Sequence, residues 1–125
     1  MSDINIRIAS IEDINVIYSI DSVYQFDKYS RNLIESSISD DINFNIVAEI
    51  GGVVVGSMSS TIIIDECNVL KIVVLPGYRN IGVASRLMQY TIQYAKDHEV
   101  KMIFLEVRKS RSNTYISITR QNNNL

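Results

Sequence analysis

The stretch from residue 78 to residue 88, YRNIGVASRLM, contains residue types that could bind an anion at the start of a helix. Arg79, Gly82 and Ala84 form an R-x-x-G-x-A pattern, and apolar residues with helical spacing follow. The first N–H groups of a helix have no partner within the helix and carry partial positive charge, so a diphosphate is a natural ligand there. The alternative is a strand–helix turn that needs glycine for its geometry alone, which is the commoner meaning of so short a pattern.

Other phosphate-binding patterns do not occur in this sequence. It contains neither G-x-G-x-x-G nor G-x-x-x-x-G-K-[ST], so the usual dinucleotide and P-loop sites lack their residues. The order of the elements also differs from that of half a dinucleotide-binding fold, because a hairpin precedes the strand and the loop.

The elements that must position this loop predict a mixed α/β domain. Ser10 and Asp13 form an S-x-x-D capping box before a helix, and Gly51-Gly52 joins two β-rich runs as a hairpin. The predicted elements are a strand over 4–9, helices after Ser10 and over 30–40, the hairpin, a strand over 67–75, a helix from Gly82 to about His98 and a strand over 101–107. The unit 67–107 would join two parallel strands by a right-handed crossover. The polar tail predicts a short helix over 113–120.

Composition limits the classes of function. The chain has 125 residues, 46% of them hydrophobic and 21% charged, which suits one globular domain over 1–125. A net charge of −2 argues against nucleic acid as the main partner. The most apolar stretch is interrupted by Glu49, a glycine pair and serines, so it predicts no membrane span. One cysteine, Cys67, and no visible secretory signal favour a cytoplasmic protein.

Several motifs together resemble the GNAT superfamily of N-acetyltransferases. LKIVVLPGYRNIGVASRLM is similar to the acetyl-CoA-binding segment of that superfamily, with its pattern [RQ]-x-x-G-x-[GA]. FLEVRKS and the later SN resemble the L-E-V-R-x-S-N of the ribosomal-protein-alanine N-acetyltransferases. The resemblance covers roughly residues 4 to 113. It implies a mostly antiparallel sheet with one parallel pair, formed by the fourth and fifth strands, and flanking helices.

The resemblance also implies which residues form the site. The backbone of Ile72, Val73 and Val74 would bind the pantetheine arm of acetyl-CoA, and an N–H of Val73 or Val74 would face the thioester oxygen. Glu106 matches the general base, and Asn113 matches an asparagine that helps to hold the cofactor. No metal is implied. The residues around the pyrophosphate would be Arg79, Asn80, Ile81, Gly82, Val83, Ala84 and Ser85.

Elementary chemistry supports this role for Glu106. An α-amino group has a pKa near 8, so a carboxylate can take its proton at modest cost. Glu106 lies in the apolar run MIFLEV, where burial would raise its pKa toward a useful value. A solvent-facing position at the end of a strand is the alternative. Cys67 and His98 are better explained as a buried structural thiol and a residue at a helix end.

The match with the family fails in the tail. The family continues with a tyrosine that protonates the leaving thiolate, but Thr119 occupies that position if the run over 116–118 replaces I-x-L. Tyr115 is the nearest candidate acid. The final two strands of the family are missing, so the fifth strand would present an open edge. Three alternatives follow: a second copy in a homodimer pairs with this edge, the tail covers it, or the chain is a truncated product of a degraded gene.

Three hypotheses for function follow. The first is acetyl transfer from acetyl-CoA to an α-amine of a protein or peptide, such as the N-terminus of a ribosomal protein. The second is an acyl-CoA-binding or self-associating remnant without catalysis, because the tyrosine and the last strands are missing. The third is acetylation of a small amine, although no acidic cluster in the sequence would select a polyamine.

Overall fold

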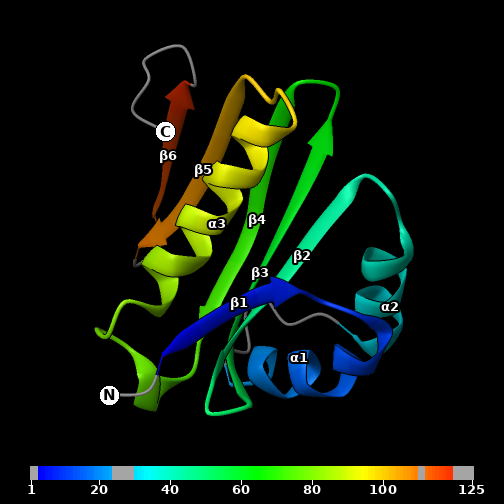
Figure 1. Cartoon of the computed structure of the whole chain (residues 1–125), viewed down its shortest axis with the longest axis vertical. Helices are drawn as coiled ribbons and strands as arrows, with labels where there is room; N and C mark the ends of the chain where they lie inside the picture. Colours follow the sequence, from blue (N-terminus) through cyan, green and yellow to red (C-terminus); the bar gives the residue numbers. More distant parts are fainter. Residues whose placement is uncertain (1–2, 24–29, 110–111, 120–125) are drawn as a thin grey trace.

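The chain forms a six-stranded sheet with the strands in sequence order, β1-β2-β3-β4-β5-β6 (Figure 1). This computed structural model describes residues 3–23, 30–109 and 112–119, and from residue 106 onward it describes the backbone. The elements are β1 (Ile4–Ile8), η1 (Ile11–Asp13), α1 (Ile14–Asp21), α2 (Arg31–Ser39), β2 (Asn43–Ile50), β3 (Val53–Ile63), β4 (Glu66–Val74), η3 (Pro76–Tyr78), α3 (Val83–Asp97), β5 (Met102–Lys109) and β6 (Ser112–Thr119).

The predicted mixed topology is confirmed. Every neighbouring pair of strands is antiparallel except β4 and β5, which are parallel and joined through α3. The hairpin between β2 and β3 turns at Gly51 and Gly52, whose φ angles are 60° and 81°. Both values lie in the left-handed region that glycine adopts without strain, which explains the glycine pair.

Helices cover both faces of the sheet. On one face, α3 buries Val83, Leu87, Thr91 and Ala95, which recur every four residues and so form a single stripe. The opposite face is covered by α1 and α2, with a smaller cluster of buried residues. That cluster contains Ala9, Ile17, Ile34 and Val47.

An ion-pair network secures the chain between β1 and α1. Two nitrogens of Arg7 donate to the Asp13 carboxylate at 2.8 and 2.9 Å, and Arg7 also pairs with Glu49 at 3.1 Å. The Ser10 N–H donates to the same carboxylate at 2.8 Å, which confirms the predicted capping contact. The guanidinium of Arg7 lowers the pKa of Asp13 below its ordinary value of 3.8.

The helix predicted over 113–120 is wrong. Residues Ser112–Thr119 form β6, which pairs antiparallel with β5 from Met102–Thr119 to Lys109–Ser112. The sequence NTYISIT is rich in β-branched and aromatic residues, which favour a strand over a helix. Of the alternatives for the β5 edge, the covering tail is the one that the structure shows, because β6 pairs with β5.

Among the described residues, none of the helices combines the length and the apolar character that crossing a membrane would require.

Candidate functional site

The parallel ladder between β4 and β5 ends partway along both strands. Its last pair is Val69–Leu105, although β4 continues to Val74 and β5 to Lys109. Figure 1 shows the two strands separating toward their carboxyl ends. We call Glu66–Val69, which pairs with strands on both sides, the closed half of β4.

An extra residue in β4 lies where the ladder ends. Ser60 and Ser59 are successive residues of β3, and they pair with Val69 and Lys71, respectively. Leu70 therefore has no residue opposite it and forms a β-bulge. A bulge bends its strand and increases the local twist, which accounts for the divergence of β4 from β5.

The open half of β4, which we define as Leu70–Val74, contains three of the predicted cofactor contacts. Ile72, Val73 and Val74 pair with β3 along one edge of the strand. Because N–H and C=O groups of a strand point alternately to its two edges, this half also directs polar backbone groups toward the side from which β5 has diverged. An extended ligand could add there as a strand does at a sheet edge.

The loop after β4 leads directly to the start of α3. Its backbone is left-handed at Asn80, with φ 64°, and at Gly82, with φ 97°. Asparagine is one of the few non-glycine residues that tolerates this region. A Cβ on Gly82 would meet no heavy atom within 4 Å, so the backbone angle and not crowding is what requires glycine there.

The N-terminus of α3 can accept an anion. No side chain caps it, and its first turn contains no acidic residue. The Arg86 N–H donates to the Gly82 carbonyl at 3.0 Å, and the earlier N–H groups of the helix have no intrahelical acceptor. Ala84 and Ser85 are exposed, as are Arg79 and Arg86, so positive charge and backbone donors lie on the same surface.

Gly56 of β3 is a residue of the site that the sequence analysis missed. A Cβ at this position would lie 3.0 Å from Val83 Cγ1 and 3.1 Å from the Val73 carbonyl oxygen. Glycine therefore allows the first turn of α3 to pack directly on β3, beside the open half of β4. A single glycine inside the strand pattern VVVGSM was the available signal, because such a glycine often marks close backbone approach.

The two proposed catalytic residues are neighbours in the sheet. Glu106 follows Leu105, the last residue of the parallel ladder, and its register partner on β6 is Tyr115. Asn113 pairs with Arg108, two positions further along β5. The side chains of Glu106, Tyr115 and Asn113 lie outside the described part of the structure, so these roles stay predictions.

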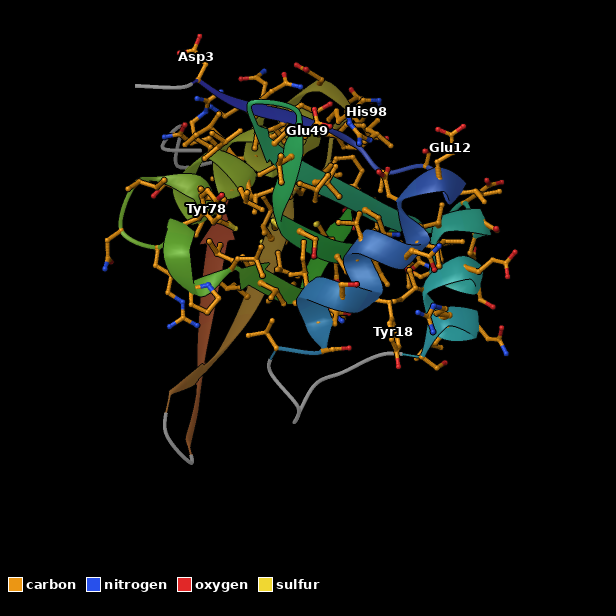
Figure 2. The ribbon with its side chains drawn as sticks, turned by 90° about the horizontal axis from the view of Figure 1, so that it is seen from below. Asp3, Glu12, Tyr18, Glu49, Tyr78 and His98 are labelled. Carbon is orange, nitrogen blue, oxygen red and sulfur yellow. The ribbon has the colours of Figure 1, made fainter. Side chains whose placement is uncertain are left out.

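Cys67 and His98 lie where the sequence placed them. Cys67 is fully buried in the closed half of β4, and burial raises the pKa of its thiol. His98 directly follows α3 as its C-cap, where its ring stacks on Tyr94 with centroids 3.9 Å apart and its Nδ1 lies 2.9 Å from the Tyr94 carbonyl oxygen. In Figure 2, His98 lies well apart from Tyr78, which belongs to η3 in the segment between β4 and α3. Within the described ranges, no group of three or more His, Cys, Asp or Glu residues is arranged to hold a metal ion.

Comparisons with known proteins agree with this geometry. Residues 11–115 match the model of a family described as Acetyltransferase (GNAT) family. The ribosomal-protein-S18-alanine N-acetyltransferase from Escherichia coli is a similar solved structure, with 21% identity and a TM-score of 0.79 over 88% of this chain and 70% of that one.

Two further solved structures are similar. PaiA N-acetyltransferase from Thermoplasma acidophilum, in complex with coenzyme A, has 19% identity and a TM-score of 0.78 over 88% of this chain and 82% of that one. Ard1 from Thermoplasma volcanium has 25% identity and a TM-score of 0.77 over 87% and 74%. A search of curated protein sequences gives no match.

Proposed function

Since the chain belongs to the acetyltransferase (GNAT) family, we propose that it transfers the acetyl group of acetyl-CoA to the α-amine of a protein or peptide, such as the N-terminus of a ribosomal protein. The observation that carries this proposal is the adjacency of two features. The open half of β4, Leu70–Val74, leads within one short loop to the uncapped N-terminus of α3.

The residues of the loop fit a pyrophosphate. The N-terminal N–H groups of α3 would donate to it, and Arg79 would balance its charge. Backbone groups of Ile72, Val73 and Val74 would bind the amide-containing arm as an added strand. These contacts are supported by the missing cap and by the absence of acidic residues from the first turn of α3. The wrapping residues would be Asn80, Ile81, Gly82, Val83, Ala84 and Ser85, with Asn113 as a further contact.

The transfer forms an amide N–C bond, breaks the thioester C–S bond and moves one proton from the amine to the departing thiolate. Glu106 would accept the amine proton as general base, and Tyr115 would protonate the sulfur. Their register pairing across β5 and β6 supports this division, because it places an acid and a base at the same level of the sheet. A backbone N–H from Val73 or Val74 would stabilise the developing oxyanion, a contribution of about 3 kcal/mol in acyl transfer. Val74 is the better candidate, because Leu75 donates its N–H to Val55 of β3 and the backbone groups of a strand point alternately to its two edges.

Association with a second copy would use a different edge from the one predicted. Because β6 pairs with β5, the outer edge of β6 takes the place of the β5 edge at this end of the sheet. Ser112–Thr119 contains no proline or charged residue, which are the usual protections of an edge strand. We expect any homodimer to pair there.

The proposal is tested by separating binding from turnover. Calorimetry would measure the affinity of the purified full chain for acetyl-CoA. Release of free thiol would then be followed with a peptide bearing a free N-terminal alanine, with the same peptide blocked by N-acetylation as the control. The proposal requires acetyl-CoA binding and thiol release that depends on the free amine.

The same assay distinguishes the alternatives. Binding without turnover on any amine would favour the non-catalytic acyl-CoA-binding module. Turnover on spermidine but not on the peptide would favour a small amine as the acceptor. Absence of acetyl-CoA binding by the folded protein would overturn the proposal, because the loop would then be a turn only.

A further inference from the structure

A buried ion pair connects α1 to the open half of β4. Lys71 Nζ lies 2.5 Å from Oδ2 of Asp21, the last residue of α1. The side chain of Lys71 is 9% exposed and that of Asp21 is fully buried. The proposed mechanism uses neither residue.

The pair lies next to the point where β4 and β5 diverge. Lys71 directly follows the bulged Leu70 and is two residues past Val69, the last β4 residue in the parallel ladder. Its contact with Asp21 places the Lys71 side chain on the face of the sheet that α1 and α2 cover. This face is opposite to that of α3, whose Val83 and Leu87 belong to the other core cluster.

The acceptor must use this α1 face if the proposed function is right. A ligand bound at the N-terminus of α3 occupies the α3 face of the open half. Its acyl group would reach the gap between β4 and β5 from that face. The amine can then approach the acyl carbon only from the opposite face, where α1 and α2 lie together (Figure 2).

A row of polar residues extends from the ion pair toward α2. Asn45, Ser59 and Lys71 are register partners across β2, β3 and β4. Ser59 Oγ donates to Asn45 Oδ1 at 2.5 Å, and Asn45 Nδ2 donates to Ser37 Oγ of α2 at 3.1 Å. On this face, polar contacts thus connect α1 to β4 and α2 to β2.

Stability alone does not explain a buried ion pair. Removing two charges from water costs several kcal/mol per ion, and apolar residues of similar volume often stabilise a protein equally well. What an ion pair does add is one defined alignment of the two elements, because its short contact tolerates little displacement. This alignment fixes where α1 ends against the open half of β4.

We propose that the Lys71–Asp21 ion pair positions the acceptor amine, by holding the carboxyl end of α1 against the open half of β4. The inference rests on the proposed acetyl transfer. Lys71 and Asp21 act here as positioning residues, since they would set the surface along which the acceptor lies without exchanging a proton with it.

The test compares matched double variants of the full chain. Asp21→Leu/Lys71→Met replaces the pair by apolar residues of similar volume, which avoids leaving one buried charge alone. Arg7→Met/Asp13→Asn removes an ion pair of β1 and η1 that is not part of the proposed site. For each protein, calorimetry gives the acetyl-CoA Kd, and steady-state kinetics give kcat and KM for the peptide with a free N-terminal alanine.

The expected result is a change confined to the acceptor. In Asp21→Leu/Lys71→Met, the acetyl-CoA Kd stays within about twofold while KM for the peptide rises at least about tenfold, less than the roughly hundredfold that a 1 Å misplacement can cost. The Arg7→Met/Asp13→Asn control keeps the KM of the unmodified chain.

Two results would overturn the inference, and they differ from failure of the proposed function. An unchanged peptide KM in a folded Asp21→Leu/Lys71→Met protein would make the pair purely structural. An equal rise in the Arg7→Met/Asp13→Asn control would make the effect a general loss of stability. Failure of the proposed function would be seen already in the unmodified chain, as absence of amine-dependent thiol release.

Discussion

The two halves of β4 follow one another directly in the chain but have different surroundings. In the closed half, Cys67 and Val69 are buried at 0% and 4% exposure between β3 and β5. In the open half, Leu70 is 52% exposed and the backbone continues without a register partner in the described β5. Each half combines apolar residues with one charged residue, Glu66 or Lys71, so composition does not distinguish a strand that fills the core from one that borders a site.

The difference comes from one residue. The bulge at Leu70 shifts the pairing with β3 and bends β4 away from β5. Beyond that point the same kind of apolar strand can offer backbone groups to a ligand. A single extra residue thereby separates a structural half from a candidate binding half, and the following predictions test that separation.

The largest effect is expected from Glu106→Gln. Glu106 is the first β5 residue after the end of the parallel ladder that joins β5 to the closed half of β4. Loss of a general base lowers turnover by about 10²–10⁴-fold. We expect kcat for the peptide acceptor to fall in that range while the acetyl-CoA Kd is unchanged. Glu66→Gln, at the exposed start of the closed half, is the matched control and keeps full turnover. Unchanged turnover in Glu106→Gln would exclude this residue as the base.

Gly82→Val tests the loop that follows the open half. A β-branched residue at φ 97° is strained, at a cost of about 1–3 kcal/mol. We expect a lower melting temperature and weaker acetyl-CoA binding. Gly77→Ala is the control, because Gly77 has no positive φ and a Cβ there would meet no atom within 4 Å. Equal losses in both variants would argue against a special role for the Gly82 conformation.

Val69→Ala and Leu70→Ala compare adjacent residues across the boundary. Val69→Ala removes two buried methyl groups. This should lower the free energy of unfolding by about 2 kcal/mol, including the effect of the cavity that remains. Leu70 is half exposed, so its truncation should cost about 0.5 kcal/mol or less. Urea unfolding of both variants measures the difference. Equal losses would mean that Leu70 is as much a part of the core as Val69.

The smallest effect is expected from Asp13→Asn, because Asp13 belongs to η1 and lies outside both halves of β4. Arg7 lowers the pKa of folded Asp13 below its ordinary 3.8, so this carboxylate stabilises the fold above that pH and loses its contribution as pH falls toward the lowered value. Because Arg7 is partly exposed, the contribution is about 1 kcal/mol or less.

Urea unfolding between about pH 5 and pH 3 should therefore show a smaller loss of stability on acidification in Asp13→Asn than in the unmodified chain. Turnover at neutral pH should stay the same, because Asp13 is not part of the site. A steeper acid loss in the variant would contradict the sign of this prediction.

Local signals were sufficient for most elements. The glycine pair at residues 51 and 52 predicted the hairpin, and the recurring apolar residues of Val83–Asp97 predicted α3, because turn geometry and helical period are properties of neighbouring residues. The tail was misjudged for a different reason. The expectation of a short helix over 113–120 gave more weight to the polar composition of the tail than to the β-branched and aromatic residues of NTYISIT, which favour a strand.

The sequence by itself determined the mixed sheet, the parallel crossover and the glycine-containing loop before α3, since these depend on spacing within short segments. Only the tertiary structure decided the rest. The bulge at Leu70, the close approach at Gly56 and the pairing of Lys71 with Asp21, 50 residues away, depend on which strands and helices come together. Such contacts join residues distant in the chain, and no local pattern specifies their register.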